Sequence, residues 1–380
     1  MTKTIYKLSA LLAILAVILP GCRKEDFIIP EEVDRIPVQN AAQLKGFYLL
    51  NEGNMNMNKA SLDFIDFEEG LYRRNIFGQA NPNAVLGLGD VGSDIGVYGS
   101  KLYAVINNSN KIEVMDMRTA QRIGVIDVKN VRYITFANGR AYVSAYGGEV
   151  QLGGSSPNGF IAEIDTATLQ ITRTVEAGRQ PEELATIGNQ LFVANSGGYD
   201  PVNYETTVSV IDLTTFTETK RIEVAPNLHR LRATDYGDLY VSSRGDHFTI
   251  PSRLFVIDTQ THSIKHTFDI ACTNLAISGD TAYIIGAEFS YLTNKWEVNY
   301  SMINVRTHTL LTGSFLPQSI IDIIQIPYGI AIDPYSGFIY ITDARDYVSP
   351  GILYCVDPNG SVMFSIRTGD IPAHFAFVYK

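Results

Sequence analysis

The chain has 380 residues and a formal net charge of −10, with 46% apolar and 18% charged residues. This balance excludes a disordered chain and a protein with many membrane spans. The acidic charge argues against nucleic acid and anionic lipid as partner surfaces. Three cysteines without C-x-x-C spacing exclude a thiolate zinc site and a disulfide framework. Abundant Tyr (21), Phe (18), Gly (31) and Pro (15) favour many short strands joined by turns.

The first 21 residues have the features of a secretory signal. Lys3 and Lys7 precede an apolar run, residues 8–19, that is too short for a stable membrane helix. The run ends in Leu-Pro-Gly-Cys, which resembles the bacterial lipobox and makes Cys22 the lipidated first residue of the mature chain. Pro20 departs from the small residue that is usual there. The alternative is an ordinary secretory signal with an incidental cysteine.

The segment after Cys22 predicts where the protein goes. Arg-Lys-Glu-Asp at residues 23–26 is similar to the signal that sends Bacteroidetes lipoproteins to the outer face of the outer membrane. A periplasm-facing anchor is the alternative. Polar residues punctuated by Pro30 and Pro37 follow and predict a tether. We therefore divide the chain into a signal peptide (1–21), a lipidated tether (22–45) and a folded domain (46–380). Cys272 and Cys355 are expected to be two buried thiols, with a bridge between them as the alternative.

Beyond residue 45 the sequence repeats. Seven segments with a central aromatic residue predict one strand of each repeat: 47–50, 102–105, 141–144, 191–194, 239–242, 282–285 and 339–342. A second apolar segment follows each of them and ends in an acid or an amide: Asp66, Asp116, Asp165, Asp212, Asp258, Asn304 and Asp357. These residues are spaced by 50, 49, 47, 46, 46 and 53 positions, and five repeats carry Thr three residues later. Asp or Asn with that Thr predicts a tight turn.

Further short apolar segments lie before and after this pair, so each repeat contains four predicted strands. Four antiparallel strands in each of seven repeats predict an all-β, seven-bladed β-propeller. A β-solenoid is the alternative, but it normally has shorter repeats. Residues 372–377 resemble the innermost strand of the other repeats, whereas the first repeat begins at its aromatic strand. The C-terminal strand is therefore predicted to close blade 1.

The segment Phe-Val-Ala-Asn at residues 192–195 and the repeated Val-Ile-Asp-x-x-Thr pattern resemble the YVTN/YncE-type seven-bladed propellers. The opening Leu-Asn-Glu-Gly-Asn at residues 50–54, followed by residues 58–62, is similar to surface lipoproteins of that type in Bacteroidetes. Some of these capture cobamides (vitamin B12). The resemblance implies a cobamide ligand and, as partner, a TonB-dependent transporter of the outer membrane.

Catalytic motifs are scarce. Gly87, Gly89 and Gly92 have dinucleotide-binding spacing, but a strand-like segment follows them, so a loop is expected. His262 and His266 are predicted to lie on a solvated outer strand, and the Asn-rich residues 51–58 to form a loop. We expect a binding protein with no cofactor, no metal and no enzymatic activity. A lyase or hydrolase that uses scattered loop residues is the alternative.

The predicted binding residues lie at one end of the central channel. In a propeller, the loops that enter the innermost strands gather there with the loops that leave the aromatic strands. Alignment of the innermost strands gives one residue per blade: Asp94, Tyr133, Glu183, Arg230, Asn274, Gly329 and His374. The preceding positions add Arg132, Glu182, His229 and Tyr328. Chosen from the outgoing loops are Asn51, Tyr146, Tyr199, Arg244, His247, Phe289, Trp296 and Arg345.

Tyr, Trp, Arg and His at such positions offer flat apolar area together with hydrogen-bond donors. This combination suits a large amphipathic ligand. A cobamide has that character, because its broad macrocycle is rimmed by amides and carries a phosphate loop. A glycan or a protein loop is the alternative, since aromatic residues and Arg are enriched at interfaces in general.

Overall fold

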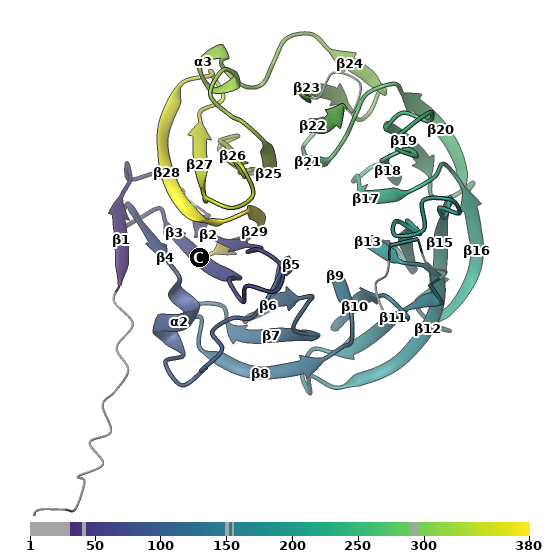
Figure 1. The fold of residues 1–380 in the computed structure, drawn as a ribbon, viewed down its shortest axis with the longest axis horizontal. Helices are drawn as coiled ribbons and strands as arrows, with labels where there is room; N and C mark the ends of the chain where they lie inside the picture. Colours follow the sequence, from purple (N-terminus) through teal and green to yellow (C-terminus); the bar gives the residue numbers. More distant parts are fainter. Residues whose placement is uncertain (1–30, 40–42, 149–151, 154–155, 291–294) are drawn as a thin grey trace, which may run out of the picture.

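The computed structural model describes residues 31–39, 43–148, 152–153, 156–290 and 295–380. Seven antiparallel sheets stand around a central axis (Figure 1). In six of them the first strand in chain order is innermost, and in blade 1 the innermost strand is the last strand of the chain. The predicted all-β, seven-bladed propeller is confirmed. Among the described residues, no helix has the length and apolar character needed to cross a bilayer.

The strands fall into four concentric positions. The innermost strands are β5 (Gly92–Tyr98), β9 (Val131–Ala137), β13 (Pro181–Ile187), β17 (Leu228–Ala233), β21 (Asn274–Ser278), β25 (Pro327–Ile332) and β29 (Pro372–Tyr379). The second strands are β2 (Leu44–Asn51), β6 (Lys101–Ile106), β10 (Arg140–Ala145), β14 (Gln190–Asn195), β18 (Asp238–Ser243), β22 (Thr281–Ser290) and β26 (Ile339–Asp343).

The third strands are β3 (Ser61–Asp66), β7 (Lys111–Asp116), β11 (Asn158–Asp165), β15 (Thr207–Asp212), β19 (Arg253–Asp258), β23 (Lys295–Asn304) and β27 (Pro350–Val356). The outer strands are β4 (Leu71–Arg74), β8 (Arg122–Asp127), β12 (Ile171–Arg179), β16 (Thr217–Glu223), β20 (Ser263–Phe268), β24 (Thr309–Leu311) and β28 (Val362–Asp370). A fifth strand, β1 (Glu32–Arg35), and two short helices, α2 (Ile76–Ala80) and α3 (Gln318–Ile321), complete the elements.

The core consists of layers between neighbouring blades. One layer joins Tyr48 and Leu62 of blade 1 to Ile95 and Leu102 of blade 2, and the other layers are built in the same way. The repeated aromatic residue supplies much of each layer, because it is almost fully buried in six of the seven blades. Apolar residues therefore cover both faces of each inner strand pair, and no blade hides them without its neighbours.

The predicted Asp-x-x-Thr turns are present. In blade 4 the Asp212 carboxylate accepts hydrogen bonds from the N–H groups of Thr214 (2.9 Å) and Thr215 (2.8 Å) and from the Thr215 hydroxyl (3.1 Å). The next residue, Phe216, takes a left-handed backbone conformation with φ of 54°. His262 occupies that same turn position in blade 5, so its predicted place on the outer strand is wrong. Its ring lies edge-on against Phe192, and only His266 is on β20.

The ring closes where the ends of the folded domain meet. Strand β29 pairs with β2 in antiparallel register, with Phe47 opposite Phe377 and Leu49 opposite Phe375, as predicted. Phe47 lies within 4.7–5.9 Å, between ring centroids, of Tyr340 and three other rings, two of them on β29. Tyr340 belongs to blade 7. The closure therefore joins strands of the first blade and seals its contact with the last.

The segment predicted to be a tether contributes to blade 1. Strand β1 pairs with β4, Ile36 is buried, and the Gln39 side chain accepts a hydrogen bond from the Tyr340 hydroxyl (2.8 Å). Residues 31–39 thus pack on the propeller, and the prediction of a tether over all of 22–45 is wrong for them. The predicted signal peptide and Cys22 lie outside the described residues.

Cys272 and Cys355 are free thiols and both are buried, as expected. Burial raises the pKa of each thiol to about 12. The Cys355 sulfur accepts a hydrogen bond from Gln39 Nε2 (3.6 Å). These cysteines are therefore unreactive core residues.

The closure of the propeller by β29 leads to a first prediction. A chain that ends at Asp370 lacks β29, which exposes the β2 edge and the apolar side of two inter-blade layers. We expect loss of the cooperative thermal unfolding transition, measured by circular dichroism. The control is a chain that begins at residue 43, which lacks the outer strand β1 with Ile36 and Gln39 but keeps every innermost strand, and should still melt cooperatively. A chain ending at Asp370 that melts like the full domain would contradict the role of β29.

Candidate ligand-binding site at the channel mouth

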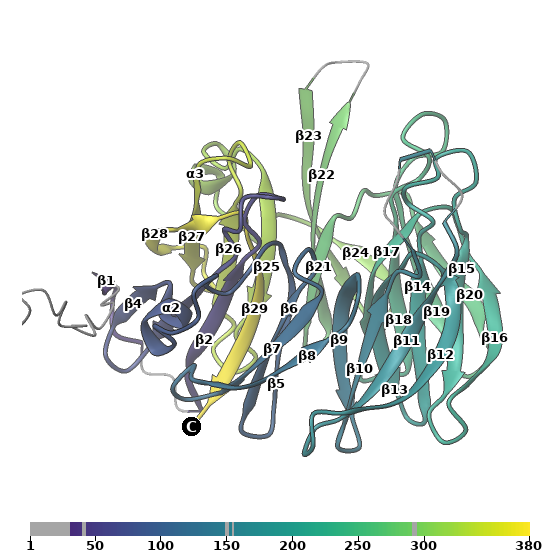
Figure 2. The same ribbon diagram turned by 60° about the horizontal axis from the view of Figure 1, so that its bottom comes forward.

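One end of the central channel gathers the loops that enter the innermost strands and the loops that join second to third strands. We call this end the mouth. The β22–β23 hairpin extends beyond the other blades there (Figure 2). Its ladder continues from the pair Thr281–Asn304 to the pair Ser290–Lys295. The hairpin therefore forms one border of the mouth.

Glu182 is the centre of one cluster at the mouth. Its side chain is buried, and Oε1 accepts hydrogen bonds from the Tyr146 hydroxyl (2.8 Å) and from Arg244 Nη2 (3.2 Å). Oε2 accepts one from Arg132 Nη2 (3.1 Å). Burial alone would raise the pKa of this carboxyl, but Arg132 and Arg244 outweigh burial and lower it. Glu182 is therefore ionised, with partners from blades 3 and 5.

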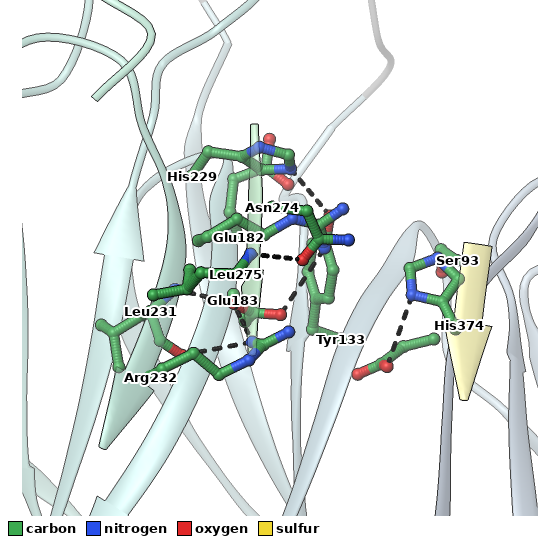
Figure 3. A network of polar contacts seen from close by, with 12 residues as sticks. Ser93, Tyr133, Glu182, Glu183, His229, Leu231, Arg232, Asn274, Leu275 and His374 are labelled. Atoms are coloured by element: carbon green, nitrogen blue, oxygen red, sulfur yellow. Dashed lines mark hydrogen bonds and ion pairs between the residues drawn. The ribbon is translucent and has the colours of Figure 1, made fainter. Parts of the chain in front are cut away.

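Glu183 forms a second cluster beside the first (Figure 3). Its carboxylate accepts a hydrogen bond from the Leu231 N–H (2.7 Å) and forms ion pairs with Arg232 and with Arg230, whose Nη1 is 3.6 Å away. Burial opposes ionisation of Glu183 as well, but the two arginines lower its pKa. Arg232 was not predicted. It lies two positions after Arg230 on β17, and this period-two spacing is the signal that would have found it.

Tyr133 lies between two guanidinium groups. The Arg132 and Arg230 carbons are 5.5 and 5.7 Å from its ring centroid, within the range of cation–π attraction. Its hydroxyl is 3.0 Å from His229 Nε2. Burial raises the pKa of Tyr133 to about 12. Burial, together with the arginines nearby, lowers the pKa of His229 well below its usual value, so the imidazole is neutral at pH 7.

The opposite side of the mouth is acidic. Glu52 Oε1 is 3.1 Å from His374 Nε2, and Glu52 Oε2 accepts a hydrogen bond from the Tyr328 hydroxyl (3.0 Å). His374 Nδ1 is 3.9 Å from Asp94 Oδ1. Burial raises the pKa of Asp94. We call Arg132, Arg230, Arg232 and Arg244 with Glu182 and Glu183 the arginine side, and Glu52, Asp94, Tyr328 and His374 the acidic side.

An aromatic surface continues from the acidic side up the hairpin. Tyr328 and Tyr347 meet edge to face at 5.8 Å, Tyr347 lies 6.1 Å from Trp296, and Trp296 lies 5.8 Å from Phe289. Phe289 and Trp296 oppose each other on β22 and β23 and remain 37% and 39% exposed. Large aromatic side chains so exposed at a rim are suited to contact a ligand or a partner.

Several of the residues predicted from the alignment of the innermost strands, one per blade, also join neighbouring blades. Asp94 accepts the Ile134 N–H (2.9 Å), Arg230 Nε donates to the Thr273 carbonyl (3.1 Å), and Asn274 Nδ2 donates to the Tyr328 carbonyl (3.0 Å). Glu183 makes the same kind of bond to blade 5. The polar side chains at these positions thus have a structural role in addition to any contact with a ligand.

In blade 7 the aligned position of the innermost strand is a glycine, Gly329. A Cβ on Gly329 would lie 2.5 Å from the Ala373 carbonyl oxygen and 2.9 Å from Thr342 Oγ1, so no other residue fits there. Thr342 makes the bond to the next blade instead, by donating to the Pro372 carbonyl (2.6 Å).

The structure brings most of the predicted site residues to the mouth. They are Asp94, Arg132, Tyr133, Tyr146, Glu182, Glu183, His229, Arg230, Arg244, Asn274, Phe289, Trp296, Tyr328 and His374. Tyr199 lies beside them, edge-on to Tyr146 at 6.3 Å.

Three predicted residues are placed elsewhere. Asn51 is fully buried inside blade 1, where Nδ2 donates to Asp63 Oδ2 (2.9 Å), so it cannot reach a ligand and the prediction is wrong. His247 contacts Asn227 and Tyr204 in the rim loops, and Arg345 bonds the Pro350 carbonyl within its own loop. Neither of the last two contacts the central clusters in the part of the chain that the structure describes.

Three other features of the described residues were candidates for a site: the glycine-rich segment, groups of metal-binding side chains, and cavities. The segment at residues 87–92 leads into strand β5 and not into a helix, so the loop expected there is confirmed. Within the described ranges, no group of three or more His, Cys, Asp or Glu is arranged to hold a metal ion. Two cavities of about 490 and about 420 Å³ lie at the end of the channel away from the mouth, where Met117, Arg118, Tyr379 and Lys380 line both. They contain none of the predicted site residues.

A family profile described as "Domain of unknown function (DUF5074)" matches residues 45–307, which is most of the propeller. The chain belongs to the DUF5074 family. No curated protein sequence matches it.

Solved structures similar to this DUF5074 protein are propellers of low sequence identity. A quinonprotein alcohol dehydrogenase-like protein from Bacteroides thetaiotaomicron VPI-5482 is 13% identical, with a TM-score of 0.60 over 88% of this chain and 78% of that one. A functionally unknown protein from Desulfotomaculum acetoxidans DSM 771 is 8% identical, with a TM-score of 0.59 over 88% and 99%. Hydrazine synthase of Kuenenia stuttgartiensis is 13% identical, with a TM-score of 0.59 over 74% and 88%. Identities this low establish the fold alone.

The buried His229 predicts a pH dependence of stability. Its folded-state pKa lies below the usual 6.5, so the unfolded chain takes up a proton first as the pH falls. As the pH falls below about 6.5, protonation of His229 in the unfolded chain therefore lowers the free energy of unfolding. The decrease is up to about 1.4 kcal/mol per pH unit until the folded-state pKa is reached. We expect His229→Gln to lose less stability than the wild type between pH 7 and pH 5, measured by urea unfolding.

The control for this measurement is His266→Gln, because His266 is an exposed residue of the outer strand β20. Its pH profile should follow that of the wild type. If the His229→Gln profile also followed the wild type, the buried neutral imidazole would be contradicted.

Proposed function

We propose that this protein is a surface lipoprotein that binds a cobamide at the mouth and passes it to a TonB-dependent transporter of the outer membrane. The observation that carries the proposal is that charged groups and aromatic side chains lie together around one end of the central channel. Guanidinium groups and hydroxyls lie at the centre, and the exposed Phe289 and Trp296 stand at the rim. A broad amphipathic ligand needs both, apolar area for its faces and donors for its polar edge.

The state of the charged groups favours binding over chemistry. Glu182 and Glu183 are held ionised by arginines, and Tyr133 and Tyr328 stay protonated because burial raises their pKa values. A general acid or base needs a pKa near the working pH. We therefore propose a binding protein and not an enzyme.

A glycan is the second candidate ligand. Sugar rings stack on exposed aromatic faces, and Trp296 at the rim offers such a face. The acidic side would then supply hydrogen-bond acceptors for sugar hydroxyls. The first candidate is preferred because the arginine side is built of donors, which suit amide carbonyls and phosphate oxygens.

Exposed apolar side chains around the mouth support the proposal that a larger partner binds there. The loops of five blades and the β22–β23 hairpin of a sixth expose them, and one example from each is Met57, Leu152, Val202, Phe248, Val348 and Trp296. Val202 and Phe248 are 86% and 84% exposed. Apolar groups gathered at one end of a propeller favour a docking face. We propose that a transporter docks there, at the same end that holds the ligand.

Cobamide binding is tested by calorimetric titration with cyanocobalamin. We expect Phe289→Ala and Trp296→Ala each to weaken binding by about 2 kcal/mol, since exposed aromatic anchors at an interface contribute about that much. Neither residue is buried, so the melting temperature should change little. The matched control is Tyr335→Ala, an exposed aromatic residue in the turn between β25 and β26 at the other end of the channel.

Two outcomes would contradict this proposal. If the wild type shows neither heat nor a shift in melting temperature, the vitamin is not the ligand and a glycan screen follows. If the wild type binds but both hairpin variants bind equally well, the ligand does not use the aromatic surface.

The location is tested separately. Cys22→Ser should release the protein from the membrane fraction, since a lipid on this residue is the proposed anchor. Replacement of Lys24, Glu25 and Asp26 by Ala should leave the protein in the membrane fraction but protect it from protease added to intact cells. Unchanged cleavage on intact cells would show that this stretch does not direct surface exposure.

A further inference from the structure

The arginine side carries more positive than negative charge. Four guanidinium groups, of Arg132, Arg230, Arg232 and Arg244, face two carboxylates, so its local net charge is +2 (4 − 2). The whole chain has a net charge of −10. A concentrated positive charge at the centre of an acidic protein is unlike its average surface and favours an anion.

The two kinds of charge are not equally accessible. The Glu182 and Glu183 side chains are 3% and 7% exposed, whereas those of Arg132, Arg232 and Arg244 are 18%, 35% and 30% exposed. The carboxylates also accept hydrogen bonds from the Tyr146 hydroxyl and from the Leu231 N–H. The surface that solvent reaches is therefore formed by the guanidinium groups of Arg132, Arg232 and Arg244, and the carboxylates hold them in place.

Donors outnumber acceptors in this cluster. Arg230 Nη1 and Arg244 Nε are buried and have no hydrogen-bond partner within the described chain, and the Arg230 side chain is only 5% exposed. The lowered pKa of His229, to which all four arginines contribute after burial, is a second sign of positive potential here. A buried guanidinium nitrogen that donates no hydrogen bond is costly, even where a carboxylate lies near it, and an oxyanion within hydrogen-bond distance reduces that cost.

The opposite side of the mouth has the reverse character. Glu52 and Asp94 lie there beside His374, which Figure 3 shows across from Tyr133 and Glu183. A ligand with one anionic group therefore has a single favourable orientation, with that group toward blades 3–5.

We infer that the arginine side binds an anionic oxygen group of the ligand, a phosphodiester or a carboxylate. The identity of the ligand rests on the proposed function, whereas the anion site is argued from the charges alone. In a cobamide the group would be the phosphodiester of the nucleotide loop. Because the guanidinium groups are partly buried, we expect their attraction to be only weakly screened by salt.

The first test compares cyanocobalamin with dicyanocobinamide, which lacks the nucleotide loop and its phosphodiester. We expect the wild type to bind cyanocobalamin at least about 10-fold more tightly, the usual effect of a charge-assisted hydrogen bond. Arg244→Gln should remove most of this difference, and Arg244→Lys should restore part of it. Arg244 is the choice because Glu182 keeps Arg132 and Tyr146 when Arg244 is replaced. Arg118→Gln is the matched control, with the same charge change at the other end of the channel.

The second test does not need a cobamide. Sodium phosphate, sodium acetate and sodium chloride are compared at equal ionic strength for their effect on the melting temperature. We expect phosphate to raise it in the wild type and in Arg118→Gln, and to raise it less in Arg244→Gln. A rise with acetate and not with phosphate would assign the site to a carboxylate.

The outcomes separate the two proposals. If the anions act through Arg244 but cyanocobalamin does not bind, the cobamide proposal fails and the anion site stands. If cyanocobalamin and dicyanocobinamide bind equally and Arg244→Gln is silent in both tests, the anion site is overturned and the cobamide proposal stands. If neither anion nor cyanocobalamin has an effect, both are overturned.

Discussion

The pairing of β29 with β2 is the constraint on which the rest of the molecule depends. Each blade has apolar residues on both faces, so a row of blades that did not close would expose one face at each end. Closure by strands from the two ends of the domain removes both exposed faces at once. Phe47 marks the seam, since its ring meets Tyr340 of blade 7 and the rings of Phe375 and Phe377 on the closing strand.

The same closure assembles half of the mouth. Glu52 follows β2 and His374 lies on β29, so these residues are 322 positions apart in sequence and 3.1 Å apart in space. Tyr328 of blade 7 bonds to the same carboxylate. The acidic side therefore exists only in a closed ring, and the proposed binding at the mouth would depend on a contact whose main energetic role is to complete the core.

The arginine side shows how buried carboxylates are stabilised at the mouth of the channel. Burying a carboxylate is unfavourable unless its oxygens are bonded and its charge is paired. Glu182 meets this requirement with groups from blades 3 and 5, and Glu183 with groups from blade 5. The paired charges hold three inner strands together and present guanidinium groups to the channel. Stability and the proposed recognition thus use the same side chains, so substitution of these residues does not separate the two.

The sequence by itself determined the blade number, the turns, the closing strand and the approximate ring of residues at the mouth. Each of these follows from a repeat near 48 residues, because equivalent positions in successive blades lie at equivalent places around one axis. Only the tertiary structure decided that Asn51 points into blade 1, that β1 forms an edge of the blade 1 sheet, and that Arg232 joins the arginine side. These depend on which way a side chain turns at the end of a strand and on contacts between distant segments. A one-dimensional repeat carries no information about either, since one residue of register reverses the face on which a side chain lies.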